Sequence, residues 1–115
     1  MIESLNSIQI EDFLKVQLRT GTITDATLNP KARVPAYVLT IDFGSLGYRI
    51  SSAQLTENYT AEDLVGKQIV AVMNFEPKRV AGIKSQVLVL GAVSSSKGVV
   101  LLEPTFTVEN GAEIA

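Results

Sequence analysis

Two runs of apolar residues constrain the fold of this 115-residue chain more than any other feature. Residues 68–75 (QIVAVMNF) and 86–93 (QVLVLGAV) are rich in β-branched and aliphatic side chains, and each has the length of a strand. Runs of this kind are typical of strands that are covered on both faces. We therefore expect two central strands of a sheet or a barrel in the second half of the chain.

Alternation of apolar and polar residues predicts a hairpin before these runs. In residues 36–43 the aromatic and aliphatic side chains share one parity, while Thr40 and Asp42 share the other. In a strand these two sets lie on opposite faces. A glycine-containing turn then leads to a short strand at 48–52, which completes the hairpin.

Residues 13–28 are expected to form a long first strand. Leu18 lies on one apolar side of it, but Ile23 has the opposite parity, so the apolar phase changes after Gly21. A glycine at such a phase change is typical of a bulge that lets one strand bend around a small barrel. Residues 99–102 predict a final strand after a Ser-rich turn.

The clearest helix signal lies at residues 60–66. Thr60 is a suitable N-cap, the acidic pair that follows it suits the positive end of the helix dipole, and Gly66 is suited to end the helix. A second helical turn is expected at 10–13, just before the first strand. Helix is therefore a minor part of the predicted structure.

The predicted order is a long bent strand, a hairpin, a short helix between strands 3 and 4, and two more strands. This order is typical of an all-β, five-stranded Greek-key barrel of the OB-fold type, which usually binds oligonucleotides or other polymers. We expect a single domain over residues 1–115. Segments 1–12 and 103–115 carry apolar side chains that a small barrel has little room to cover, so we expect these extensions to form a homodimer.

Composition argues against several classes of site. Cys and His are both absent, so a thiolate nucleophile, the commonest general base and the commonest metal ligands are missing. Lys84 and Ser85 are not expected to form a catalytic dyad, because neighbours in an extended strand point to opposite faces. We therefore predict no enzyme activity, no metal site and no cofactor.

The charges are unevenly distributed along the chain. The formal net charge is −2, yet residues 31–84 carry seven basic and five acidic side chains, and acids outnumber bases on either side of this segment. Such a distribution is compatible with a local basic patch on an acidic protein. The first residues lack the basic and long apolar regions of a signal peptide, so we expect a cytoplasmic protein.

Residues 74–86 (NFEPKRVAGIKSQ) resemble the motif of tRNA-binding domains, in which Asn, Pro, a basic residue, Gly and Lys-Ser recur at this spacing. These domains are OB-fold modules appended to some methionyl- and tyrosyl-tRNA synthetases and to their accessory proteins. Residues 13–23 are similar to the first strand of that family, where a basic residue precedes a small residue and Gly. The resemblance extends over nearly the whole chain and implies the same fold.

Within this family the chain is most similar to stand-alone secretion chaperones of bacteria, notably at 31–37, 51–56 and 100–104. That similarity implies a cytoplasmic homodimer that binds unfolded or presecretory polypeptides without ATP. Synthetase modules usually carry His-Pro-x-Ala-(Asp/Glu) where residues 29–33 read Asn-Pro-Lys-Ala-Arg, and this departure favours the chaperone branch. The alternative function is that of a tRNA-binding protein, or of an accessory module that serves a synthetase in trans.

Candidate ligand-binding residues come from three places. The connection at 76–85 and the loop after the first strand carry cations that could contact phosphates, carboxylates or an extended polar chain. The hairpin face could line the groove of an OB-fold, although the parity of Tyr37 also fits the core. The full set is Lys31, Arg33, Tyr37, Arg49, Ser51, Ser52, Asn74, Lys78, Arg79, Lys84 and Ser85.

Overall fold

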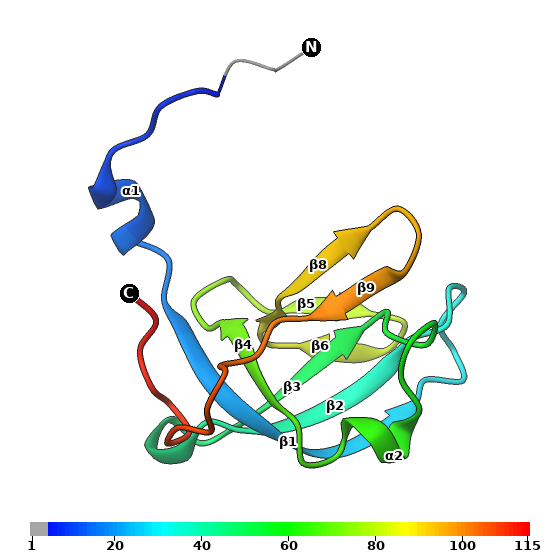
Figure 1. Cartoon of the computed structure of the whole chain (residues 1–115). Coiled ribbons are helices and arrows are strands. Elements are labelled where there is room, and N and C mark those ends of the chain that lie inside the picture. Colours follow the sequence, from blue (N-terminus) through cyan, green and yellow to red (C-terminus); the bar gives the residue numbers. More distant parts are fainter. Residues whose placement is uncertain (1–4) are drawn as a thin grey trace.

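The computed structural model describes residues 5–115 and confirms the all-β OB-fold. Its main sheet is antiparallel, with strand order β3-β2-β1-β4-β7, and two further ribbons extend from it (Figure 1). The sheet strands are β1 (Leu18–Leu28), β2 (Tyr37–Asp42), β3 (Tyr48–Ala53), β4 (Gln68–Val72) and β7 (Leu88–Val89). The ribbons are β5 (Lys78–Val80) with β6 (Ile83–Ser85), and β8 (Gly91–Ser94) with β9 (Gly98–Leu101).

Within the described residues, helix is confined to short segments, as the sequence predicts. These are α1 (Ile10–Leu14), the 3₁₀ turn η1 (Gly44–Leu46) and α2 (Ala61–Leu64). Helix α2 lies between β3 and β4, where it was expected. None of the helices in residues 5–115 is long and apolar enough to cross a membrane.

Thr60 caps α2 as predicted. Its side-chain oxygen accepts a hydrogen bond from the backbone N–H of Asp63 (3.1 Å), and its own backbone N–H donates to the Asp63 carboxylate (3.1 Å). Hydrogen bonds from Thr60 to the Asp63 carboxylate, first the one from its backbone N–H, hold the pKa of Asp63 below its ordinary value of 3.8. Leu64, at the end of this helix, is completely buried against the barrel.

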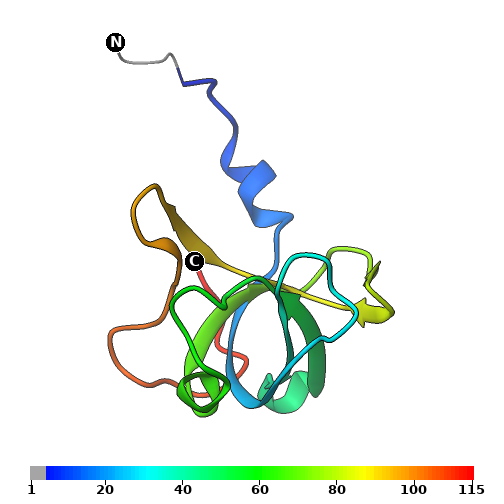
Figure 2. The ribbon, with the colours of Figure 1, turned by 90° about the vertical axis from the view of Figure 1, so that its right-hand side faces the viewer.

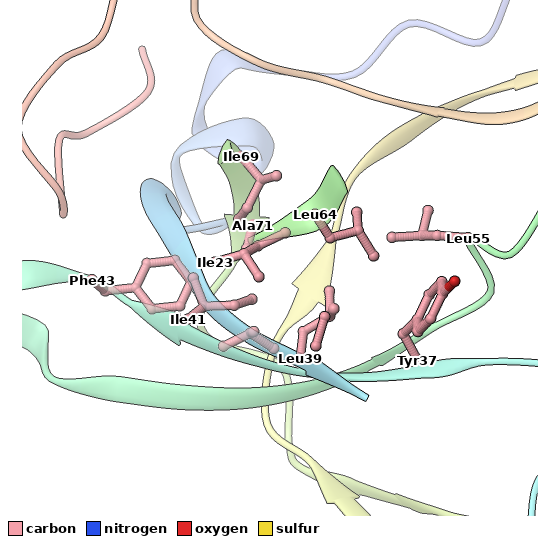
Figure 3. Close-up of a cluster of buried hydrophobic side chains, with 11 residues drawn as sticks. Ile23, Tyr37, Leu39, Ile41, Phe43, Leu55, Leu64, Ile69 and Ala71 are labelled. Carbon is pink, nitrogen blue, oxygen red and sulfur yellow. The ribbon is translucent and has the colours of Figure 1, made fainter. Parts of the chain in front are cut away.

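The core fills the inside of the barrel. Figure 3 shows β1, β2, β4 and α2 contributing side chains to one cluster, and Tyr37 lies in the same cluster. The apolar parity of residues 37–43 therefore faces inward, as alternation predicts. The labelled members of the cluster are Ile23, Tyr37, Leu39, Ile41, Phe43, Leu55, Leu64, Ile69 and Ala71.

The long first strand differs from the prediction in two details. It starts at Leu18 rather than at residue 13, because the preceding residues form α1 and a short linker. Its register shift lies between Ile23 and Asp25, so the bulge is at Thr24 and not at Gly21. Gly21 serves close packing instead, because a Cβ there would lie 2.7 Å from side-chain atoms of both Ile41 and Phe43.

Two other predicted boundaries are wrong. The run 86–93 is not one strand, since β7 ends at Val89 and the chain enters a separate ribbon at Gly91. A Cβ on Gly91 would lie 2.6 Å from Val99, so the absence of a side chain permits this crossing. Residues 76–85 are not a plain loop, because they contain the β5–β6 ribbon.

The terminal segments behave differently from each other. Residues 109–114 return along β1, where Thr20 and Leu18 exchange backbone hydrogen bonds with Gly111, Ala112 and Ile114 (2.7–3.0 Å). The segment from residue 5 to α1 projects away from the barrel in both views (Figure 2), and residues 1–4 of the predicted extension lie outside the described residues.

Candidate ligand-binding surface

The β5–β6 ribbon presents two cations side by side. Arg79 and Lys84 are directly paired across the ribbon, and both are exposed. Directly opposed residues of an antiparallel pair share a face, where like charges destabilise the pairing. The ribbon therefore holds a cationic pair at some cost to its own stability, which is typical of a surface that meets an anionic partner.

The turn of the ribbon has the geometry of a tight hairpin. Ala81 and Gly82 both have positive φ, at 47° and 84°, which is the requirement of a two-residue type I′ turn. Arg79 donates from its guanidinium to the carbonyl of Gly82 (3.3 Å), so this side chain lies along the turn. The turn fixes the direction in which the basic side chains leave the ribbon.

Three hollows surround this ribbon. We call them the Phe75 hollow (about 320 Å³), the Lys31 hollow (about 340 Å³) and the Lys84 hollow (about 460 Å³). The Phe75 hollow is lined by Ser52, Phe75, Glu76, Lys78, Val80, Ser85, Gln86, Val87 and Leu88. The Lys31 hollow is lined by Lys31, Ala32, Arg33, Val34, Ala36, Ser52, Gln54, Val80 and Ala81. The Lys84 hollow is lined by Val38, Ile50, Arg79, Gly82, Ile83, Lys84 and Gln86.

Side chains at the end of β6 and just after it attach the ribbon to the free edge of β3. The backbone N–H of Ser52 donates to the Ser85 hydroxyl (3.0 Å), and that of Ile50 donates to the side-chain carbonyl of Gln86 (2.9 Å). The backbone N–H of Gln86 donates in turn to the carbonyl of Ile50 (2.8 Å). Ser85 and Gln86 thus close the barrel and place the ribbon beside the β2–β3 face.

Asn29 joins the two basic loops. Its side chain is 8% exposed, donates to the carbonyl of Ala81 at the ribbon turn (3.3 Å) and accepts from the backbone N–H of Lys31 (3.0 Å). The loop that carries Lys31 and Arg33 is therefore tied to the ribbon that carries Arg79 and Lys84. Buried amides that bridge two loops in this way hold them in one relative position.

The structure brings together seven of the eleven residues singled out from the sequence. Lys31 and Arg33 border one hollow, Lys78 and Ser85 another, and Ser52 lies between them. Arg79 and Lys84 border the third hollow on the other side of the ribbon. The seven residues are Lys31, Arg33, Ser52, Lys78, Arg79, Lys84 and Ser85.

Four residues of the predicted set lie elsewhere. Tyr37 and Ser51 are buried, and their hydroxyls donate to the carbonyls of Tyr59 (2.8 Å) and Val87 (3.0 Å), so both serve the core. A direct ligand contact at either position does not fit the described structure, because inward parity removes their side chains from the surface. The other two, Arg49 and Asn74, hold turns and segments of the chain.

Arg49 lies at the η1 turn, where it donates to the carbonyls of Leu46 (2.6 Å) and Tyr48 (3.1 Å). Its parity on β3 is that of Ser51, so it is directed to the opposite face from Ser52. The Asn74 side chain accepts from the backbone N–H of Gln17 (2.9 Å) and donates to the carbonyl of Lys15 (2.7 Å). Asn74 therefore fixes the linker between α1 and β1, away from the cationic ribbon.

The apolar part of this surface is not among the residues singled out from the sequence. Phe75 and Leu88 remain 55% and 49% exposed at one hollow, together with the half-buried Val80. Phe75 lies inside the motif at 74–86, but its type alone fits a core residue equally well. Asn29 was also missed as the residue that joins the two basic loops, although residues 29–33 were already noted to depart from the family pattern.

The fold of this chain is similar to that of known proteins. Two crystal structures of the chaperone CsaA are similar to the chain. The one from Bacillus anthracis (strain Ames) is 55% identical, with a TM-score of 0.91 over 96% of this chain and 100% of that chain. The one from Picrophilus torridus is 45% identical, with a TM-score of 0.89 over 95% of this chain and 100% of that chain.

A curated relative comes from the translation machinery. The methionine–tRNA ligase of Thermococcus onnurineus is 37% identical over 107 residues, which cover 93% of this chain but only 14% of the ligase. The family model described as "Putative tRNA binding domain" matches residues 18–113, which include the whole barrel and the returning C-terminal segment. The resemblance inferred from the motif at 74–86 is thereby confirmed, and the chain belongs to the tRNA-binding domain family.

Proposed function

We propose that this protein is an ATP-independent chaperone that binds unfolded or presecretory polypeptides in the cytoplasm. The two CsaA structures similar to this chain are those of chaperones. In this proposal the protein acts by binding alone, without catalysis, metal or cofactor. An exposed apolar segment of the client is buried reversibly on the surface of the barrel.

The Phe75 hollow is the observation that carries this proposal. The apolar side chains among its lining residues are Phe75, Val80, Val87 and Leu88, and its volume of about 320 Å³ suits one or two apolar side chains. Phe75 and Leu88 are about half exposed although both are large and apolar. An apolar hollow on the surface of a small barrel is typical of a binding site for apolar groups.

A homodimer is part of the same proposal. Along the projecting N-terminal segment, Leu5, Ile8, Ile10 and Leu14 are between 62% and 91% exposed. A second copy of the chain would cover these side chains. The exposure of these side chains supports the N-terminal part of the prediction that the terminal extensions form a dimer.

The second candidate function is tRNA binding, alone or as an accessory module of a synthetase. The observation that favours it is the cationic pair of Arg79 and Lys84 on the β5–β6 ribbon, which forms no salt bridge within residues 5–115. The match to the tRNA-binding domain family supports it equally. Phosphate contacts by such cations release counterions, so this binding would weaken steeply with added salt.

The test is fluorescence anisotropy of a labelled, unfolded presecretory segment at low and moderate salt, with Phe75→Ala and the matched control Phe106→Ala. Phe106 is 80% exposed and lines none of the three hollows. We expect Phe75→Ala to raise the Kd roughly tenfold, as loss of a central apolar anchor does, and the control to leave it unchanged.

The same titration separates the two functions. If the segment fails to bind at both salt concentrations while labelled tRNA binds with a steep salt dependence, the chaperone proposal is wrong and tRNA binding replaces it. If the segment binds and tRNA does not displace it, the chaperone proposal stands. Apolar burial should also give a negative heat-capacity change in calorimetry.

A further inference from the structure

The Phe75 hollow and the Lys31 hollow adjoin each other. Ser52 of β3 and Val80 of β5 line both of them, so the two hollows are parts of one surface. An extended chain advances about 3.3 Å per residue. A bound segment that fills the first hollow with an apolar side chain therefore brings a residue a few positions away to the second.

The two hollows differ in charge. The Lys31 hollow is lined by Lys31 and Arg33, and no acidic residue is among its lining residues. In the Phe75 hollow Lys78 is accompanied by Glu76, so its charge is balanced. The positive charge is thus concentrated on the Lys31 side, where an anionic group is favoured and a cationic group is repelled.

The walls favour a polypeptide over a nucleic acid. Of the residues that line these two hollows only Phe75 is aromatic, while Ala32, Val34, Val80 and Leu88 are aliphatic. Single-stranded nucleic acid is usually held by stacking of successive bases on aromatic side chains. The lining is better matched to aliphatic and aromatic side chains of a peptide that are flanked by a carboxylate.

Asn29 holds the cationic loop in position before a ligand arrives. Its buried amide contacts both the backbone N–H of Lys31 and the carbonyl of Ala81. A Cβ at Gly82 would lie 3.7 Å from Cδ of Lys31, so the methylene stem of the lysine lies along the ribbon turn. A prepositioned loop loses less conformational entropy on binding than a free one.

We propose that the client segment carries an acidic side chain a few residues from its apolar anchor, and that Lys31 and Arg33 bind this carboxylate. This inference rests on the proposed polypeptide-binding function and adds the class of segment that is selected. Asn29 acts in it as a positioning residue, because it sets the place of the cationic loop without reaching the carboxylate itself.

The experiment uses three labelled peptides of equal length that share one apolar anchor. The flanking residues are Glu in the first, Gln in the second and Lys in the third. We expect the Glu peptide to bind at least about fivefold more tightly than the Gln peptide, and the Lys peptide to bind most weakly. Added salt should reduce the difference between Glu and Gln peptides.

Variants assign the preference to the Lys31 hollow. The double variant Lys31→Gln/Arg33→Gln should bind the Glu and Gln peptides with equal affinity. Lys97→Gln is the matched control, because Lys97 is an exposed lysine at the tip of the β8–β9 ribbon and lines none of these hollows. It should retain the full preference.

Asn29→Ala tests the positioning role. Provided that its circular dichroism spectrum matches that of the unchanged protein, it should weaken binding of the Glu peptide and leave the affinity for the Gln peptide unchanged. An equal loss for both peptides would show a merely structural role for Asn29. If Asn29→Ala does not fold, the double variant and the peptide series still decide the inference.

The outcomes distinguish this inference from the function on which it rests. If all three peptides bind with equal affinity and the double variant changes nothing, the acidic preference is wrong while polypeptide binding stands. If none of them binds, both fall. If a labelled single-stranded RNA binds and Lys31→Gln/Arg33→Gln abolishes that binding while the peptides remain unbound, the hollow is a nucleic-acid site and the inference is overturned.

Discussion

At the scale of single residues, the opposed pair of Arg79 and Lys84 links stability to binding. A like-charged pair directly across two strands weakens the pairing by up to about 1 kcal/mol. The same two side chains border the Lys84 hollow and are free to meet an anion. Their position therefore favours contact with an anionic ligand rather than stability of the fold.

Replacing one member of this pair separates the two effects. Lys84→Gln should leave the urea midpoint unchanged or raise it slightly, because repulsion of Arg79 is removed. In the tRNA-binding alternative, tRNA should bind more weakly, and the slope of log Kd against log salt should fall by about one unit, as loss of one phosphate contact predicts. Denaturation and anisotropy on the same preparation measure both quantities.

The control for this prediction is Lys97→Gln, which removes an exposed lysine outside the three hollows. It should change neither quantity beyond error. A clear loss of stability in Lys84→Gln would contradict the view that the pair opposes folding.

At the scale of elements, α2 depends on the exchange of hydrogen bonds between Thr60 and Asp63. Because the pKa of Asp63 is lower in the folded protein than its ordinary value of 3.8, its ionised form stabilises the fold. This contribution is fully present above that ordinary value. It is lost as the pH falls through the lowered pKa, when the folded carboxylate takes up its proton.

Asp63→Asn should therefore be less stable than the unchanged protein at pH 7. The difference should narrow below about pH 4 and vanish once Asp63 of the unchanged protein is protonated. Urea denaturation at a series of pH values measures this. Glu62→Gln removes a charge from the same turn but leaves the Thr60–Asp63 exchange intact, so it should show a smaller dependence on pH.

The elements also show what the sequence can and cannot reveal. Alternation at 36–43 and the cap at Thr60 are local signals, and both elements were predicted correctly. The division of 86–93 was missed because an apolar run does not show at which residue a chain leaves one sheet for another ribbon. The β5–β6 ribbon was missed because its three-residue strands are too short and too charged to give a periodic pattern.

For the candidate surface, features encoded by neighbouring residues were predicted, while contacts between distant residues were not. The cations of the ribbon were found because they belong to a motif of fixed spacing. The role of Asn29 depends on Ala81, a residue more than fifty positions away, and no local pattern reports such a contact. Tyr37 and Ser51 were both included among the candidate binding residues, Tyr37 with its parity also fitting the core, and the structure buries both side chains.

At the scale of the whole molecule, the two terminal segments play different structural roles. The C-terminal segment is already held by β1 through backbone hydrogen bonds and through an ion pair of Arg19 with Glu113 (3.7 Å). The N-terminal segment projects from the barrel (Figure 2). Ile10 and Leu14 of α1 are exposed. The proposed dimer should therefore depend most on the N-terminal segment.

The double variant Ile10→Asp/Leu14→Asp tests this dependence. It should sediment as a monomer at concentrations where the unchanged protein is a dimer, because burial of two charges in an apolar contact opposes association. Analytical ultracentrifugation gives the mass directly. Val93→Asp is the control, since Val93 is 86% exposed on the β8–β9 ribbon, away from α1. An unchanged dimer in the double variant would place the interface elsewhere.

The attachment of β3 to Ser85 and Gln86 has a consequence for solubility. An uncovered strand edge is a template on which other chains add by β-pairing, and it promotes aggregation. Here the outward amides of Ile50 and Ser52 already donate to side-chain oxygens of the same molecule. Under the proposed chaperone function, a bound client chain would therefore find no strand edge on β3 and would not be drawn into an intermolecular sheet there.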